Sequence, residues 1–222
     1  LIKMSEKIKD SLFKIWIILS TLLMFTVVIY IFGYIFKNGI ASINMEFIFG
    51  DPKGIPIGSE GGIFPAIIGS LFLMIIACIF ASILAISTAV YTVFYCRFKK
   101  IESIIHLIVQ CMAGTPSIIL GLFGYTLLVL YLGLGRSLLS AGLTLGIMIF
   151  PYIEVRVEKT LREIDKSIVE SSYVLGISKA YTIFKLILPI CKKDIISAIT
   201  LAGGFAMGAA APIILTGAVI FA

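Results

Sequence analysis

The side chains of this 222-residue chain that could bind or react are few, and the largest group of them lies in one polar segment, residues 156–193. Eight of the eighteen Lys and Arg residues fall in this segment, and the stretches on both sides of it are apolar enough to lie in a membrane. The chemistry open to it is non-covalent. A charged, partly helical segment held between two membrane spans is well placed to be bound by a partner outside the bilayer.

A second polar group, Thr115-Pro116-Ser117, interrupts an apolar run. Proline is favoured at the first position of a helix, so Pro116 is expected to begin a half-helix there. Its free N–H groups, with the Thr115 and Ser117 hydroxyls, could then face an anion. A proline kink that only supports helix packing is the simpler alternative, and three nearby glycines also fit close helix approach: Gly114, Gly121 and Gly124.

Patterns typical of enzymes and metal sites are not found in the sequence. It contains no HExxH, no GxSxG, no paired intramembrane carboxylates and no GxxxxGK[ST], so any ATP hydrolysis is expected on a separate subunit. His106, the one histidine, is expected as a packed or interfacial side chain, and Glu154 with Arg156 as the mark of a span's cytoplasmic end. We therefore expect no catalytic residue, no metal and no cofactor. Four cysteines lack CxxC spacing and are interpreted as packing residues: Cys78, Cys96, Cys111 and Cys191.

Composition indicates a membrane protein. The chain is 60% hydrophobic and 14% charged, with a mean hydropathy of +1.13, whereas soluble domains carry about 25% charged residues. The net charge of +6 could suggest nucleic acid. The basic residues instead fall in three clusters separated by apolar runs, which is the pattern of topology determinants. We therefore expect no nucleic-acid partner.

The apolar runs predict an all-α, polytopic transmembrane helical bundle. The first run is too long for a signal peptide and is interpreted as an uncleaved span. The loop 38–62 is rich in Gly and Pro and is expected to be irregular and external, so that residues 1–62 form one region and 63–222 the next. Five spans are predicted: Leu12–Phe36, Ile63–Tyr95, Ile104–Leu132, Leu138–Val155 and Ile195–Ala222.

The distribution of charge predicts orientation. With the N-terminus inside, fifteen Lys and Arg residues lie on the inner side, and three lie outside: Lys37, Lys53 and Arg136. This bias predicts a cytoplasmic N-terminus and a cytoplasmic polar segment.

Local signals within the polar segment predict a helix, a turn and a second helix. One apolar face is expected from Ile164, Ile168 and Leu175, with Ser171 between them. Gly176 can take the positive φ that ends a helix, and Ser178 can cap a second one, which stops or bends at Pro189. That helix would carry an apolar face of its own: Tyr181, Phe184 and Leu188. An ordinary amphipathic loop at the membrane surface is the alternative.

The spacing of residues 170–189 resembles the EAA loop of bacterial and archaeal ABC importer permeases. That family's pattern is E-A-A, three residues, G, nine residues, then I-x-L-P, and Glu170, Gly176 and Leu188-Pro189 stand at the matching places. Ser171 and Ser172 replace the usual alanines, and Leu186 replaces Ile. The resemblance implies that the segment from Glu170 through Ser178 and Lys179 docks into a cleft of a cytoplasmic ATPase subunit.

Three further segments resemble permeases for phosphate, especially their A-type subunit (PstA). They are MAGTPSIILGLFG (112–124), GGIFPAIIG (61–69) and GAAAPIILT (208–216). They correspond to the family's A-G-V-P-S-I-x-x-G-L-F-G, to the start of its conserved domain, and to its G-E-T-A-P-L-L-x-T. The resemblance implies phosphate as the cargo and adds Thr216 to Thr115, Pro116 and Ser117 as a possible pathway residue.

The departures from that subunit concern the substrate. Phe205, Ala209 and Ala210 stand where phosphate permeases carry Arg, Glu and Thr, and residues 195–222 contain no charge. The usual sixth span is not recognised either. Three explanations stay open: the partner subunit supplies the charge, the cargo is another oxyanion or small solute, or this is a degenerate, non-transporting membrane subunit.

The same resemblance implies a setting for the chain. Residues 63–222 would form the permease domain, with the coupling loop at about 156–193, in the cell's cytoplasmic membrane. The implied partners are a second permease subunit, a cytoplasmic ABC ATPase dimer, an external substrate-binding protein and membrane lipid.

Overall fold

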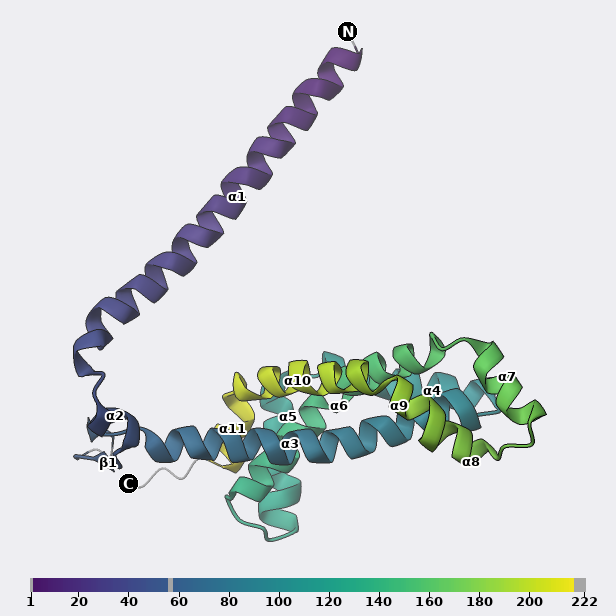
Figure 1. The fold of residues 1–222 in the computed structure, drawn as a ribbon. Coiled ribbons are helices and arrows are strands. Elements are labelled where there is room, and N and C mark those ends of the chain that lie inside the picture. The colour runs from purple at the N-terminus through teal and green to yellow at the C-terminus, as the bar shows by residue number, and fades with distance from the viewer. Residues whose placement is uncertain (1, 56–57, 218–222) are drawn as a thin grey trace. The chain divides into compact units, whose positions relative to one another are not determined.

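The computed structural model describes residues 2–55 and 58–217; the side chains of residues 2–8 and of Lys166 are outside this description. The chain divides into two compact units, Leu1–Pro65 and Ala66–Ala222 (Figure 1). It is mostly helical, which confirms the all-α class. Three described helices are long and apolar enough to cross a membrane, or four if one bent pair counts as a single span. The number of five spans stays a prediction.

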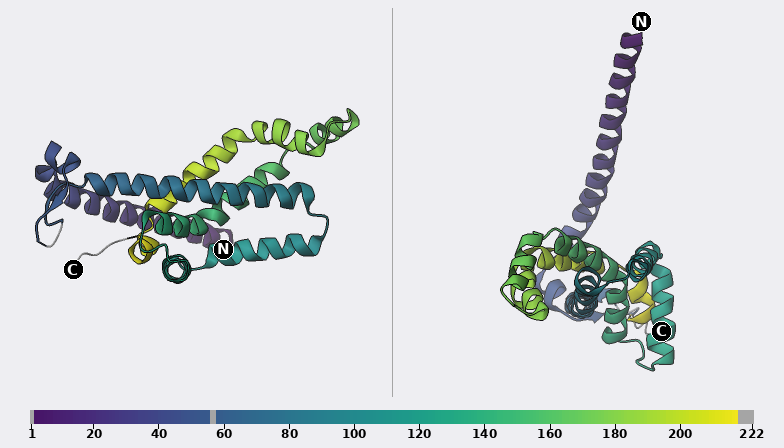
Figure 2. Two further views of the ribbon diagram at one scale, coloured as in Figure 1. Left: turned by 90° about the horizontal axis from the view of Figure 1, so that it is seen from below. Right: turned by 90° about the vertical axis from the view of Figure 1, so that its right-hand side faces the viewer.

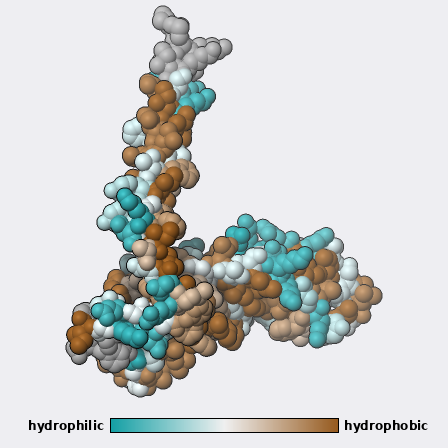
Figure 3. All heavy atoms as spheres, turned by 60° about the vertical axis from the view of Figure 1, so that its left-hand side comes forward, coloured by the Kyte–Doolittle hydropathy of each residue, from teal (hydrophilic) through white to brown (hydrophobic). Residues whose placement is uncertain are grey.

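In the first unit, α1 (Ile2–Gly39) is one long helix that contains the predicted span Leu12–Phe36. Every side chain from Lys9 to Asn38 is exposed, and apolar residues make up much of the helix face that Figure 3 shows. A helix that is apolar all round suits lipid better than water.

The loop after α1 is more ordered than predicted. It holds a 3₁₀ turn, η1 (Ile40–Ser42), the short helix α2 (Met45–Phe49), and two antiparallel strands, β1 (Pro52–Lys53) and β2 (Glu60–Gly61). The side chain of Asn44 caps α2 by accepting a hydrogen bond from the Phe47 N–H at 2.7 Å.

In the second unit, α3 (Phe64–Val90) continues as a π-helical segment, η2 (Tyr91–Tyr95). One face of α3 is a buried stripe of alanines spaced by one turn: Ala77, Ala81, Ala85 and Ala89. Opposite α3, two glycines of α6 leave no space for a side chain. A Cβ atom at Gly146 would lie 2.7 Å from the Phe80 ring, and one at Gly142 would lie 2.8 Å from the Ile76 Cβ. Small residues on both helices therefore permit their close approach.

Helix α6 (Leu138–Arg162) is the centre of the unit. It extends almost two turns beyond the predicted span Leu138–Val155, and it packs against α4, α5, α10 (Lys192–Met207) and α11 (Ala211–Thr216). Its buried apolar side chains form the core: Leu145, Met148, Ile149, Ile153, Val157 and Leu161.

The third predicted span is broken at Thr115-Pro116. Helix α4 (Lys99–Gly114) and helix α5 (Ser117–Gly124) meet at an angle of 102°, and α5 continues as the π-helical segment η3 (Tyr125–Tyr131). Pro116 is therefore the N-cap residue, with ψ at 137°, and Ser117 begins the half-helix. The expectation that Pro116 would be the first helical residue was wrong by one position.

The fifth predicted span is also not one helix. Gly208–Ala210 separate α10 from α11, and α11 folds onto α5 and α6. A Cβ atom at Gly121 of α5 would lie 3.0 Å from the Pro212 Cα, and one at Gly124 would meet the Thr144 side chain. Both glycines thus allow close helix approach, as predicted. Gly114 has no atom within 4 Å of its Cβ position, so that expectation was wrong there.

Candidate functional site

Residues 165–190 form a helix–turn–helix, the docking hairpin, at one end of the second unit (Figures 1 and 2). Its first helix, α7 (Lys166–Val174), is capped by Asp165. The hydrogen bond from the Ser167 backbone N–H lowers the pKa of the Asp165 carboxyl. Gly176 turns the chain with φ at +72°, and Ser178 caps the second helix. The predicted turn and cap are confirmed, because both depend on local chemistry alone.

The second helix of the hairpin ends at Ile190, one residue after Pro189. It runs from α8 (Lys179–Tyr181) through a π-helical segment, η4 (Thr182–Ile187), into α9 (Leu188–Ile190). The wide π turn places Pro189 in the first turn of α9, where a missing N–H costs no intrahelical bond. The predicted stop or bend at Pro189 is confirmed to within one residue, and after Cys191 the chain continues directly into α10.

Two of the apolar side chains predicted to share one face of the first helix do not pack inward. Ile168 and Leu175 are exposed, whereas Ser172 is only 4% exposed. The Ser172 hydroxyl donates to the Val169 carbonyl at 2.7 Å and lies 3.0 Å from the Thr182 hydroxyl across the hairpin. Ser172 therefore helps to hold the two helices together.

We expect Ser172→Ala to loosen the hairpin, because it removes this cross-helix hydrogen bond. Such a bond contributes about 0.5–1.5 kcal/mol, so amide hydrogen exchange in α7 should speed up by roughly threefold to tenfold. Ser171→Ala is the matched control, since Ser171 is exposed and makes no such bond among the described residues. Equal exchange rates in the two variants would contradict this role.

Lys179 fastens the hairpin to the end of α3. Its Nζ donates to the Phe94 carbonyl and lies 4.5 Å from the centroid of the Tyr95 ring. A cation over an aromatic face contributes about 0.5–1 kcal/mol at an exposed site. The Lys179 side chain is thus engaged within the chain.

The tip of the docking hairpin is apolar and exposed. Val174 is 87% exposed and Leu175 is 77% exposed. Tyr181 and Phe184 on the second helix are exposed as well, as are the polar Glu170 and Ser171. Beside α7 runs a groove of about 550 Å³, whose lining includes Phe94, Leu161, Ile164, Val169 and Tyr173. Arg162 and Glu170 also line this groove, so exposed apolar residues lie beside a groove of mixed polarity, which makes this end of the hairpin a candidate contact surface.

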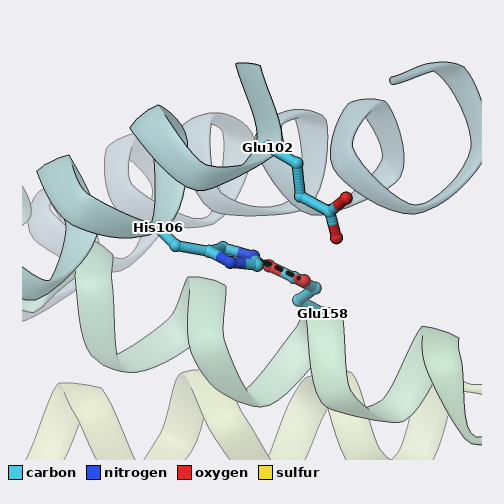
Figure 4. Close-up of side chains that lie close together, drawn as sticks. All are labelled: Glu102, His106 and Glu158. Carbon is cyan, nitrogen blue, oxygen red and sulfur yellow. Dashed lines mark hydrogen bonds and ion pairs between the residues drawn. The ribbon is translucent and has the colours of Figure 1, made fainter. Parts of the chain in front are cut away.

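A polar cluster, which the sequence did not predict, joins α4 to α6 near the start of the hairpin. It consists of Glu102, His106 and Glu158 (Figure 4), together with Arg162. The His106 Nε2 lies 2.9 Å and 3.1 Å from the two Glu158 oxygens. Arg162 contacts Glu102 at 2.5 Å and Glu158 at 2.7 Å. The members lie on two helices far apart in the sequence, so no local pattern could have revealed them.

Glu154 lies next to this cluster in the interior of the second unit, and its place at the cytoplasmic end of a span stays a prediction. It is 1% exposed, and among the described residues neither of its carboxylate oxygens has a hydrogen-bond partner. It lines a cavity of about 360 Å³ together with His106, Gln110 and Glu158. Glu154 and Glu158 are one turn apart on α6, so two carboxylates lie close together here.

The possible pathway residues are not joined to one another. The Thr115 hydroxyl donates to the Cys111 carbonyl at 2.7 Å, and the fully buried Thr216 donates to the Pro212 carbonyl, also at 2.7 Å. Ser117 is exposed at the start of α5. In the described part of the chain no hydrogen bond links Thr216 to either of the others. Their role in a pathway stays a prediction.

Phe205 packs on an aromatic side chain of α6. Its ring centroid lies 5.0 Å from that of Tyr152. Both rings line a pocket of about 240 Å³ that also includes Arg156. The structure thus brings a positive side chain to the pocket that contains Phe205.

Comparison with known proteins shows what the chain is similar to. Residues 81–220 match the family described as binding-protein-dependent transport system inner membrane component. The chain is 31% identical over 217 residues to the probable phosphate transport system permease protein PstA of Methanocaldococcus jannaschii. The matching region covers 96% of this chain and 74% of that protein. It is 26% identical over 213 residues to the probable ABC transporter permease protein YqgI of Bacillus subtilis, across 96% of this chain and 72% of that one.

A solved structure has a similar fold. The methionine ABC transporter MetNI in its inward-facing form matches with a TM-score of 0.59, over 66% of this chain and 72% of that chain. The sequence identity is 19%, so the likeness concerns the fold alone.

Proposed function

Because the chain belongs to the family of binding-protein-dependent transport system inner membrane components, we propose that it carries inorganic phosphate through the membrane as a permease subunit of an ABC importer. Membership in the family makes it a transport component of such an importer, embedded in the membrane by several helices. We further propose that the cargo is phosphate, that the N-terminus is cytoplasmic, and that the residues named below contact the ATPase and the cargo.

The docking hairpin is proposed as the element that couples this subunit to ATP hydrolysis. The observation that carries this proposal is that Val174 and Leu175, at the tip of the hairpin, are apolar and exposed. The hairpin is short, capped at both helices and fastened at Lys179, so a push on its tip moves it as a unit. Glu170, Ser171 and Gly176 lie at or near the tip, and the hydrogen bond between Ser172 and Thr182 holds the two helices together.

Movement of the hairpin would reach the membrane helices through two connections. Helix α6 enters the hairpin within three residues of its end, and α10 leaves it at Lys192. These two helices pack along each other over much of their length. A shift of the ATPase pair would therefore tilt α6 and α10 together and alternate access to the pathway. An external binding protein and a second permease subunit complete the proposed assembly.

Phosphate is proposed as the cargo on the strength of the relatives and of one pocket. The M. jannaschii protein is described as a phosphate permease, as is the PstA protein of Mycobacterium leprae, which is 28% identical over 217 residues. Arg156 lines the pocket beside Phe205, and no salt bridge involves it in the described part of the chain. We propose that Arg156 supplies the positive charge for an oxyanion. Thr115, Pro116, Ser117 and Thr216 are proposed to line the same route.

The experiment that tests this function is uptake of labelled phosphate by cells with the complete importer, with and without this chain. Uptake that depends on the chain is the expected result. Phosphate uptake that is the same in both cells would reject the cargo. In that case, uptake of another oxyanion or small solute that depends on the chain would support the second candidate, to which Phe205 and Ala209 point.

Replacing Arg156 with glutamine is expected to lower the rate of phosphate uptake at least tenfold, because an oxyanion loses its cationic partner. The double variant Arg156→Gln/Phe205→Arg should recover part of the uptake, since both side chains line one pocket. Arg136→Gln is the control, because Arg136 lies over the Tyr125 ring in another part of the unit. Wild-type uptake by the single variant, with normal expression, would argue against this role.

A further inference from the structure

The polar cluster between α4 and α6 has the donor atoms of a metal site. One ligand atom each from Glu102, His106 and Glu158 lies within 4.8 Å of the others (Figure 4). The His106 Nε2 and the nearest Glu158 oxygen are already 2.9 Å apart. A metal ion bound at about 2.0–2.2 Å to each ligand holds neighbouring ligand atoms roughly 3.3 Å apart. Small rotations of the Glu102 side chain would therefore close the site.

Glu154 provides an independent reason to expect a cation. Its carboxylate is buried, lines the same cavity as His106 and Glu158, and has no hydrogen-bond partner among the described residues. Burial of an unpaired polar group is costly, and for a carboxylate the cost is larger still. A cation in the cavity would satisfy this carboxylate directly. Within residues 2–55 and 58–217, no positively charged side chain lies at hydrogen-bonding distance from the Glu154 carboxylate.

The charges in and around the cluster do not balance. Three carboxylates, those of Glu102, Glu154 and Glu158, face one guanidinium, that of Arg162. The cluster and the cavity beside it thus contain more acidic than basic side chains, an arrangement that suits a bound cation. The other charged side chains at this cavity, Lys159 and Glu163, pair with each other at 3.8 Å.

Arg162 contacts two of the carboxylates that a metal ion would bind, those of Glu102 and Glu158. Its guanidinium bridges Glu102 and Glu158, so the cluster already holds a positive charge there. The Arg162 side chain is 44% exposed and could turn outward into solvent when an ion enters. Arg162 is thus a competitor for the site, and its removal should favour metal binding.

We propose that Glu102, His106 and Glu158, with Glu154 behind them, bind a divalent transition-metal ion. Imidazole and carboxylate ligands together suit Zn²⁺ and Mn²⁺. The bound ion would fasten α4 to α6 just before α6 enters the docking hairpin. Metal binding would therefore stiffen the base of the hairpin, in addition to any role of the chain in transport.

The test is Zn²⁺ binding to the purified, full-length chain in detergent, measured by competition with a chromophoric chelator. Co²⁺ absorption spectra report whether imidazole and carboxylate ligands surround the ion. We expect one ion per chain, a loss of affinity of at least tenfold in His106→Gln and Glu158→Gln, and a gain of about tenfold in Arg162→Gln. Glu163→Gln is the matched control, since Glu163 is an exposed acid that pairs only with Lys159 among the described residues.

Two results would overturn the proposal. One is wild-type affinity no higher than that of the double variant His106→Gln/Glu158→Gln. The other is a weaker binding of Zn²⁺ by a folded Arg162→Gln variant, as expected if the cluster is only a network of ion pairs. Gel filtration and thermal unfolding without metal establish that each variant is folded. The expected gain in Zn²⁺ affinity of Arg162→Gln is, in addition, a result that misfolding cannot produce.

Discussion

Replacing Leu175 with aspartate is expected to abolish co-purification of the ATPase subunit with this chain, and with it ATP-driven uptake. Leu175 is 77% exposed at the tip of the docking hairpin, so the substitution removes no internal contact of consequence. In a docked complex the side chain would be buried, and a carboxylate there would lose its hydration. A central apolar residue of this kind contributes about 2–4 kcal/mol to an interface, which corresponds to a roughly 30-fold to 1,000-fold loss of affinity.

The control for this experiment is Leu175→Met, which keeps an apolar side chain of similar size and should keep the ATPase bound. Far-UV circular dichroism and expression level report whether the aspartate variant is folded. Undiminished ATPase recovery with Leu175→Asp would rule out the tip as the contact. If uptake were lost while the ATPase stayed bound, Leu175 would be needed to transmit the movement of the ATPase and not to bind it.

The parts of the docking hairpin that were predicted correctly depend on neighbours in the sequence. Gly176 takes a positive φ because it lacks a Cβ atom, and Ser178 caps the next helix because its hydroxyl can reach a backbone N–H three residues on. The face of α7 that packs inward was not predicted, since a nine-residue helix has too few apolar residues to show which side packs. That choice depends on Thr182 and Val169, which hold Ser172 inward.

The polar cluster and the buried Glu154 could not be predicted for a different reason. Glu102 and Glu158 meet only because α4 and α6 pack side by side, and sequence spacing says nothing of that pairing. Glu154 was interpreted as a boundary charge because Arg156 is close in sequence. On a helix, however, residues two apart point to different sides, and Glu154 faces the core while Arg156 is exposed. Charge composition therefore did not reveal that Glu154 is buried.

Replacing Gly146 with leucine is expected to destabilise the second unit more than any other single change considered. A Cβ atom at Gly146 would lie 2.7 Å from the Phe80 ring and 3.2 Å from the Ala77 carbonyl oxygen. The ring could turn away, but the backbone of α3 cannot move without separating the alanine stripe from α6. Overpacking of this kind costs about 1–3 kcal/mol, occasionally more. We expect a lower midpoint of thermal unfolding in detergent and poor assembly with the partner subunits.

Gly204→Leu is the matched control, because Gly204 is also helical and has no atom within 4 Å of its Cβ position. It should unfold at or above the wild-type temperature, since leucine favours a helix by roughly 0.5–1 kcal/mol relative to glycine. Equal stability of the two variants would mean that α3 and α6 are not held as closely as Gly146 and Ala77 indicate. The comparison therefore tests whether small residues, more than any polar contact, determine how the helices that carry the docking hairpin pack.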